Sequence, residues 1–158
     1  GFKYICAEMM RGDVLLGVEE SGGVAFRRHI PERDGLAAGL MLLELLALRG
    51  RSVNQLIAEL EREYGPHCYG RVDLHVDRAR AERCLARLER HPPQRLLRSP
   101  LETVQTFDGL KFTARDGSWL MLRGSGTEPV VRVYAEAPGD QAVARLLAQG
   151  RRWLAQAG

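Results

Sequence analysis

The chain has 158 residues, of which 45% are hydrophobic and 27% charged, and its formal net charge is +3. This length fits one domain or one and a half, and the composition predicts a folded chain. Its basic residues do not form the run with interleaved aromatics that is typical of a nucleic-acid surface. The longest apolar stretch, from Leu36 to Leu48, is interrupted by Glu44 and is too short to cross a bilayer.

The cysteines argue against two further classes of protein. There are three of them, without a Cys-x-x-Cys pair, so neither a disulfide framework nor a zinc site is expected. No signal-peptide pattern is present, and we expect a cytoplasmic protein with no membrane partner.

The first fifty residues predict a helix, a strand and a second helix. Mixed apolar spacing over residues 2–10 predicts a helix that ends near Gly12, and residues 14–18 read as a short apolar strand. We expect the loop after this strand to bind a ligand, as loops at the carboxyl ends of strands do in open α/β sheets. Asp34 is the predicted N-cap of a helix from Gly35 to Leu48.

The helix from Gly35 to Leu48 is apolar on nearly every face. Its large apolar residues are Leu36, Leu40, Met41, Leu42, Leu43, Leu45, Leu46 and Leu48. Such a helix is normally buried on more than one side, and one strand with one neighbouring helix cannot cover it. We therefore expect it to pack against polypeptide outside this chain or to self-associate with a second copy.

A connecting helix is predicted from Val53 to Tyr64. Ser52 and Gln55 form a capping box at its start, and Gly65-Pro66 ends it. The expected division is the end of one domain, a connecting segment and a complete second domain, at residues 1–50, 51–65 and 66–158.

The second domain is predicted to combine strands with two helices. The expected elements are a strand at 67–76, a helix at 77–90, strands at 104–107, 110–114, 119–122 and 130–137, and a helix at 140–156. The Asp-Gly pairs at 108–109 and 116–117 are strong hairpin signals between neighbouring strands. The aromatic residues expected in the core are Phe107, Phe112, Trp119 and Trp153.

A short segment late in the chain has the composition of a phosphate-binding loop. It reads Arg-Gly-Ser-Gly-Thr-Glu-Pro and is followed by two valines and an arginine. Glycines let backbone N–H groups approach an anion, hydroxyls donate hydrogen bonds, and arginines make bidentate, charge-assisted bonds to phosphate oxygens. The predicted phosphate-binding residues are Arg123, Gly124, Ser125, Gly126, Thr127 and Arg132.

The alternative for this segment is a tight hairpin whose arginines face solvent. The joint presence of two arginines, two hydroxyls and two glycines favours the ligand site. The surrounding charge agrees, because residues 51–158 hold seventeen basic and thirteen acidic side chains, a balance of +4, whereas residues 1–50 hold six and seven, a balance of −1.

This segment resembles the phosphate-binding loop of the α-D-phosphohexomutases, the phosphoglucomutase and phosphomannomutase superfamily. The last domain of that family carries a similar R-x-S-G-T-E-P sequence with a further arginine downstream. A second segment, Gly17-Val18-Glu19-Glu20-Ser21-Gly22-Gly23, resembles the G-x-E-x-S-G sugar-binding loop of the family's third domain. The stretches 1–5 and 33–36 also fit the surroundings of that loop, so the resemblance covers nearly the whole chain.

The resemblance implies a division of roles between the two segments. The segment from Arg123 to Arg132 would hold the substrate phosphate that is not being transferred, whereas Glu19 and Ser21 would hydrogen-bond sugar hydroxyls. Lys3 and Arg33 are further candidates for contacts to phosphate or sugar. The implied fold is α/β plus α+β: the second half of an α/β sugar-binding domain, then a complete β-α-β-β-β-α phosphate-binding domain with an antiparallel sheet.

The family transfers a phosphoryl group between the 1 and 6 positions of a hexose through a bisphosphate intermediate, an isomerase reaction of carbohydrate metabolism. Hexose phosphates and hexose bisphosphate are the implied ligands. The transferring phosphoserine and the magnesium-binding aspartates belong to the family's earlier domains, and no serine of this chain stands in a Ser-His-Asn setting. We expect a C-terminal portion of a longer enzyme, without catalytic or metal-binding residues of its own, inactive alone and dependent on those earlier domains, which bind the magnesium.

Two alternatives come from other functional classes. The first is a free-standing, non-catalytic phosphosugar-binding module, and the second is a nucleic-acid-binding domain, prompted by the basic second half. The Glu-Glu-Ser-Gly-Gly form of the sugar loop resembles the glucose and mannose branches of the family more than the glucosamine branch, but the sequence does not identify the preferred hexose.

Overall fold

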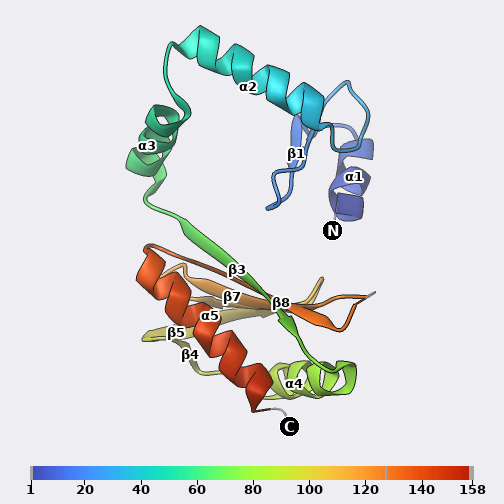
Figure 1. Cartoon of the computed structure of the whole chain (residues 1–158), viewed down its shortest axis with the longest axis vertical. Coiled ribbons are helices and arrows are strands. Elements are labelled where there is room, and N and C mark those ends of the chain that lie inside the picture. Colours follow the sequence, from blue (N-terminus) through green and yellow to red (C-terminus); the bar gives the residue numbers. More distant parts are fainter. Residues whose placement is uncertain (1, 127, 157–158) are drawn as a thin grey trace. The chain divides into compact units, whose positions relative to one another are not determined.

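The computed structural model describes residues 2–126 and 128–156. The chain divides into two compact units, Gly1–Leu60 and Glu61–Gly158 (Figure 1). None of the described helices is long and apolar enough to cross a membrane.

Unit 1 contains a small hairpin with a helix beside it. Helix α1 covers Phe2–Met10, and strands β1 (Leu16–Val18) and β2 (Val24–Phe26) pair antiparallel. The helix approaches the hairpin at Gly17, where an added Cβ would lie 2.5 Å from Ile5 Cγ2 and 2.7 Å from Met9 Sδ. The strand expected at 14–18 is therefore present, but its partner β2 was not predicted from the sequence.

Helix α2 (Gly35–Arg49) begins where the sequence predicts. The Asp34 carboxylate accepts from the backbone N–H groups of Leu36 at 3.0 Å and Ala37 at 2.9 Å. Gly50 ends the helix in the left-handed conformation, with φ of 58°. Because these signals act within one turn of the chain, both ends of the helix could be predicted from the sequence alone.

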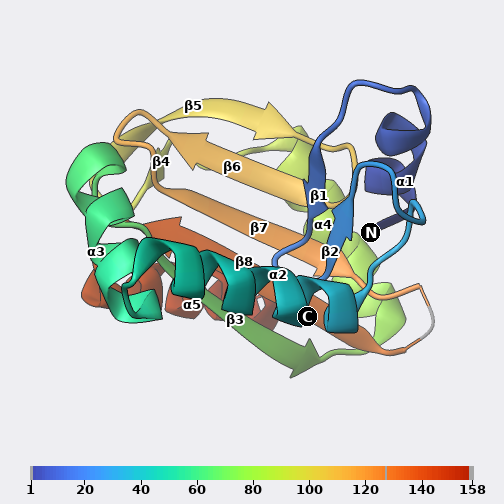
Figure 2. The same cartoon turned by 90° about the horizontal axis from the view of Figure 1, so that it is seen from above.

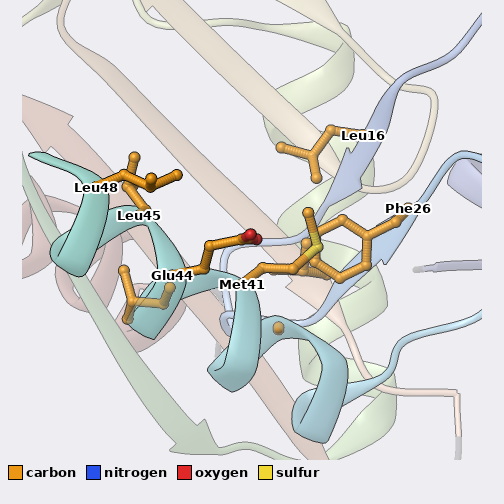
Figure 3. A pocket seen from close by; sticks show the side chains of 9 residues that line it. Leu16, Phe26, Met41, Glu44, Leu45 and Leu48 are labelled. Atoms are coloured by element: carbon orange, nitrogen blue, oxygen red, sulfur yellow. The ribbon is translucent and has the colours of Figure 1, made fainter.

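The apolar surface of α2 is exposed within unit 1. None of its residues is buried, and Leu36 and Leu48 keep 84% and 80% of their surface. A hollow of about 480 Å³ lies between α2 and the hairpin (Figure 3). It is lined by Leu16, Val24, Phe26, Ala38, Met41, Leu42, Glu44, Leu45 and Leu48. The apolar side chains of α2 thus form an exposed surface and one wall of this hollow within unit 1.

Helix α3 (Val53–Tyr64) has the predicted capping box. The Ser52 N–H donates to Gln55 Oε1 at 2.8 Å, and the Gln55 N–H approaches Ser52 Oγ at 3.4 Å. Gly65 follows with φ of 87°, a conformation that favours glycine.

Unit 2 is a six-stranded antiparallel sheet with two helices on one face (Figures 1 and 2). Its strand order is β3-β8-β7-β6-β5-β4. The strands are β3 (Cys68–His75), β4 (Arg95–Leu96), β5 (Ser99–Gln105), β6 (Leu110–Ala114), β7 (Trp119–Gly124) and β8 (Val130–Ala137). The helices are α4 (Arg78–Arg90) and α5 (Asp140–Ala155). The predicted antiparallel sheet with two helices is confirmed, with the short strand β4 in addition to the five expected strands.

The core of unit 2 lies between the sheet and its helices. Alternate residues of the central strands are fully buried there, including Phe112, Leu120, Leu122, Val133 and Ala135. The residues between them face the other side of the sheet, away from α4 and α5; in the part of the chain that the structure describes, no helix of this unit covers that face. Polar side chains of several strands can therefore meet on this open face.

The aromatic core prediction is correct for Phe112 and wrong for Phe107. Phe112 is completely buried, and the ring of Trp153 meets it edge to face at a centroid distance of 5.5 Å. Trp119 is partly buried, and its ring lies 4.3 Å from the ammonium group of Lys111. Phe107 is 77% exposed because β5 ends at Gln105, which places this residue in the turn to β6 rather than in a strand.

Candidate phosphate-binding site

The predicted phosphate-binding segment connects β7 to β8. The register of these strands places Arg123 directly opposite Arg132. Hydrogen bonds within the loop include the Ser125 N–H to the Val130 carbonyl at 2.8 Å, the Glu128 N–H to Ser125 Oγ at 3.2 Å and the Val130 N–H to the Glu128 carbonyl at 2.8 Å. Thr127, also predicted to bind phosphate, lies outside the described residues. The structure thus brings the two arginines together at the mouth of a closed turn.

Gly124 and Gly126 leave open space beside the loop. Neither has a φ in the left-handed region, so the backbone conformation alone does not require glycine here. A Cβ built on either residue would meet no described atom within 4 Å. The missing side chains therefore leave the backbone of the turn accessible to a ligand.

Each arginine already faces a carboxylate. Arg123 Nη2 lies 3.1 Å from Asp108 Oδ2, in the turn between β5 and β6. Arg132 Nε lies 3.7 Å from Asp73 Oδ2, and its Nη2 lies 3.8 Å from Glu128 Oε2. The Nε of Arg132 is buried without a hydrogen bond in the described part of the chain, which marks it as a donor with unused capacity.

Asp73 is itself held by a second arginine on the same strand. Arg71 makes two bonds to it, Nε to Oδ1 and Nη2 to Oδ2, both at 2.7 Å. The hydrogen bonds from Arg71 hold the pKa of Asp73 below its ordinary value. Sequence reasoning missed Arg71, Asp73 and Asp108 as neighbours of the site. The turn at 108–109 was predicted, but the strand register and the packing of this turn against β7 are not visible in the sequence.

The predicted sugar-binding residues occupy the turn of the β1–β2 hairpin. Ser21 Oγ donates to Glu19 Oε1 at 2.9 Å, and Arg33 Nη1 donates to the same oxygen at 2.9 Å. Gly23 lies close against this cluster: an added Cβ would lie 2.6 Å from Arg33 Cδ and 2.7 Å from Glu19 Oε1, so these side chains would have to move. The structure therefore brings together Glu19, Ser21 and Arg33.

Lys3, the fourth residue predicted in this region, has a different neighbour. Its ammonium group lies 4.8 Å from the centre of the Tyr4 ring, and no contact with Glu19 is seen among the described residues. The turn and the phosphate loop belong to different units of the chain.

The Glu19 carboxylate is held in its charged form. Its side chain is only 15% exposed. The hydrogen bond from Arg33 is the main cause that lowers the pKa of Glu19, partial burial acts against it, and Ser21 adds a further lowering. A carboxylate held in this way can accept hydrogen bonds from neighbouring hydroxyls at neutral pH.

We expect the pair of Glu19 and Arg33 to be lost only as the pH falls below 4.5, the ordinary value for a glutamate. The folded pKa is lowered, so the pair stabilises the turn above the unfolded pKa, and this contribution disappears as the pH falls through the folded pKa. The carboxyl ¹³C shift of Glu19, followed against pH, measures this directly. The variant Arg33→Met should raise the pKa of Glu19; the same titration curve in both proteins would contradict the role given to Arg33.

Described residues of this chain do not form a metal site. No group of three or more His, Cys, Asp or Glu side chains in the described part of the chain is placed to hold a metal ion. The clusters in both loops instead pair carboxylates with arginines, which suits anions and hydroxyl groups rather than a cation.

Comparison with known proteins identifies both halves of the chain. Residues 1–64 match the family domain described as phosphoglucomutase/phosphomannomutase, alpha/beta/alpha domain III, and residues 74–152 match the phosphoglucomutase/phosphomannomutase C-terminal domain. These matches agree with the resemblance of the two motifs, which fall one in each domain.

Individual relatives carry the names of several mutases. A phosphoglucomutase/phosphomannomutase of Thermococcus kodakarensis is 28% identical over 99% of this chain and 32% of the relative. A phosphoglucosamine mutase of Frankia alni is 36% identical over 94% of this chain and 28% of the relative. A crystal structure from Thermus thermophilus, assigned as a phosphomannomutase, has a TM-score of 0.74 and 33% identity over 98% of this chain and 30% of its own.

The chain spans about a third of the length of these relatives. Because the two family domains together match most of its residues, the chain belongs to the phosphoglucomutase/phosphomannomutase family.

Proposed function

We propose that this chain supplies the substrate-binding part of a phosphohexomutase, an isomerase that interconverts hexose 1-phosphate and hexose 6-phosphate through a hexose bisphosphate. The segment from Arg123 to Arg132 holds the phosphate that is not being transferred. Glu19 and Ser21 hold hydroxyl groups of the sugar. The single observation that carries this proposal is the direct opposition of Arg123 and Arg132 at the mouth of a glycine-containing turn.

The geometry suits a doubly charged phosphate ester. Two guanidinium groups in adjacent strands can bind different oxygens of one phosphate, and each offers a planar pair of N–H donors. Backbone N–H groups at Gly124 and Gly126, together with the hydroxyls of Ser125 and Thr127, complete the proposed set of donors. Ser125 Oγ accepts from the Glu128 N–H at 3.2 Å, so this residue is part of the hydrogen-bonded turn of the loop.

Such a loop binds phosphate regardless of the sugar attached to it. The bisphosphate intermediate has to turn end for end between the two transfer steps, so each end must fit the same holding site. Binding of the phosphate that is not transferred then positions the other end of the substrate for reaction. A donor set made of arginines and backbone N–H groups meets this requirement.

In the proposed sugar-binding loop, Glu19 accepts hydrogen bonds from the sugar, and Arg33 orients the Glu19 carboxylate. The carboxylate is oriented by Arg33 and Ser21, which leaves its second oxygen, Oε2, to accept from sugar hydroxyls. Arg33 also binds Glu32, with 2.9 Å between Nε and Oε1, so we assign it to orienting Glu19 rather than to phosphate. Lys3 stays a candidate for contact with phosphate or sugar.

Phosphoryl transfer itself is assigned to other parts of the complete enzyme. We propose that residues 1–50 complete a sugar-binding domain, that residues 51–65 connect the domains, and that residues 66–158 form the phosphate-binding domain. The exposed apolar surface of α2 supports the proposal that earlier domains of such an enzyme pack against this helix. We assign the magnesium expected in the complete enzyme to its other parts; among the described residues no group of three or more His, Cys, Asp or Glu side chains is placed to hold a metal ion.

The same residues support a second candidate, a phosphosugar-binding module without catalysis. The two proposals agree on the site and differ only in the rest of the polypeptide. Isomerase activity of the complete natural protein would favour the phosphohexomutase over the non-catalytic module. The charged substrates do not cross bilayers unaided, which supports a cytoplasmic location for either candidate.

The proposal is tested by titrating the chain with inorganic phosphate and with glucose 1-phosphate, observed by NMR. We expect both ligands to shift the backbone amides of Gly124, Ser125 and Gly126 and the Nε–H signals of Arg123 and Arg132. Shifts confined to other basic residues, or none at millimolar phosphate, would show that this turn is not the anion site.

A further inference from the structure

Four charged side chains form a row across the open face of the sheet in unit 2. Asp73 of β3 is the register partner of Arg132 of β8, which is in turn the partner of Arg123 of β7. Beyond Arg123 comes Asp108, whose Oδ2 lies 3.1 Å from Arg123 Nη2. The row therefore has a carboxylate at each end and two guanidinium groups in the middle, at the proposed phosphate site.

The two central arginines repel each other when no anion lies between them. Like charges directly opposite in an antiparallel pair are unfavourable. A long arginine side chain with several rotatable bonds responds by turning away, unless another group holds it. Arg132 has two carboxylates nearby, Asp73 and Glu128, whereas among the residues that the structure describes Arg123 forms an ion pair with Asp108 only.

The turn that carries Asp108 is fixed against β7. Gly109 has φ of 122°, and a Cβ built there would lie 2.8 Å from the Leu122 carbonyl and 3.1 Å from Arg123 Cβ. The turn thus runs against the backbone beside Arg123, at a distance that only glycine permits. This close approach sets where the Asp108 carboxylate stands. Both side chains of the ion pair are about two-thirds covered, at 31% and 30% exposed.

We propose that Asp108 is a positioning residue for the phosphate site: its carboxylate holds the Arg123 guanidinium beside Arg132, so that the two cations face one anion. This inference rests on the proposed function of the loop. Asp108 does not touch the phosphate in this scheme and acts only through Arg123. The alternative is that Asp108 only neutralises Arg123 and competes with the ligand. Removal of the Asp108 carboxylate would then strengthen phosphate binding, because a nearby negative charge is lost.

The test compares Asp108→Ala with Asp108→Asn by calorimetric titration of inorganic phosphate into the 158-residue chain. We expect Asp108→Ala to raise the Kd by about three- to tenfold, since binding must then immobilise the Arg123 side chain. Asp108→Asn keeps an acceptor oxygen for Arg123 and should stay within about twofold of the original Kd. Rescue by asparagine separates orientation from the loss of charge, which both variants share.

Asp116→Ala is the matched control. Asp116 occupies the equivalent Asp-Gly turn at the other end of β6 and β7, where its Oδ1 accepts from the Ser118 N–H at 3.0 Å. This variant should keep the original Kd. Unchanged or tighter phosphate binding by Asp108→Ala, at an unchanged melting temperature, would overturn the positioning role while leaving the loop as the phosphate site. If the unaltered chain binds no phosphate, the proposed function fails, and this inference fails with it.

If Asp108→Ala loses its fold, the same question is answered in Asp108→Asn and in the unaltered chain by NMR. Slow motion and a dispersed signal of the Arg123 Nε–H group without phosphate would support an ion pair that holds the side chain. A Nε–H group as mobile as that of the exposed Arg115 in both proteins would overturn the proposal.

Discussion

Replacing Phe112 by alanine is expected to lower the free energy of unfolding of unit 2 by about 3–5 kcal/mol. The side chain is completely buried, and its ring contacts Trp153 edge to face. Truncation removes the apolar burial, the aromatic contact and the filling of the space between α5 and the sheet. Both tryptophans of the chain, Trp119 and Trp153, belong to unit 2, so tryptophan fluorescence in urea measures the unfolding of this unit.

Phe107→Ala is the matched control for this prediction. It removes the same side chain from a position that is 77% exposed, and we expect a change within about 0.5 kcal/mol. Similar losses in the two variants would contradict the different burial of the two rings. Phosphate affinity of Phe112→Ala, measured where the variant is still folded, should be close to that of the original chain, because Phe112 faces away from the open side of the sheet.

The contrast between these two phenylalanines shows where sequence reasoning loses accuracy. Phe107 and Phe112 both stand near a run of alternating apolar residues, which favours strands for both. Whether Phe107 is core or turn depends on where β5 stops pairing with β6, and the last paired residue is Gln105. This end point is set by pairing with a distant segment, so local pattern alone could not place it.

Helix ends were predicted more accurately, since their signals are local. Asp34 and Ser52 cap the helices that follow them, with the expected bonds to backbone N–H groups. Asp77 also caps its helix, by accepting from the Arg80 N–H. Strands β2 and β4 were missed because each is very short and is defined by its hydrogen bonds to a neighbouring strand rather than by a local sequence pattern. Pro100 also obscured the beginning of β5, as proline within a run of residues argues against a strand.

In the candidate site, too, the features that are local in sequence were predicted and those that depend on tertiary structure were not. Its arginines, glycines and hydroxyls stand within ten residues of sequence, so their composition predicted a phosphate loop and the family resemblance added a role. The opposition of Arg123 to Arg132 depends on the register of β7 and β8. Asp73 and Asp108 reach the site from β3 and from another turn, and only tertiary structure brings them there.

The phosphate role of Arg123 leads to the strongest functional prediction. Arg123→Ala is expected to weaken binding of inorganic phosphate by roughly 10- to 150-fold, because each lost hydrogen bond to a charged group contributes about 1.5–3 kcal/mol. Arg123→Lys keeps the charge but loses the planar pair of donors, so its Kd should fall between those of the original chain and the alanine variant. Calorimetric titration at about 0.1 M ionic strength measures all three proteins under conditions where distant surface charges are screened.

Arg115→Ala separates this role from a general effect of positive charge. Arg115 is exposed in the turn at the far end of β6 and β7, so its removal lowers the net charge equally without touching the loop. We expect its phosphate affinity to change by less than about twofold, as a distant surface charge is largely screened. Equal losses in the two alanine variants would mean that phosphate responds to the overall charge of the basic half. A loss confined to Arg123→Ala, with an unchanged melting temperature, is the result that the opposed arginines of β7 and β8 require.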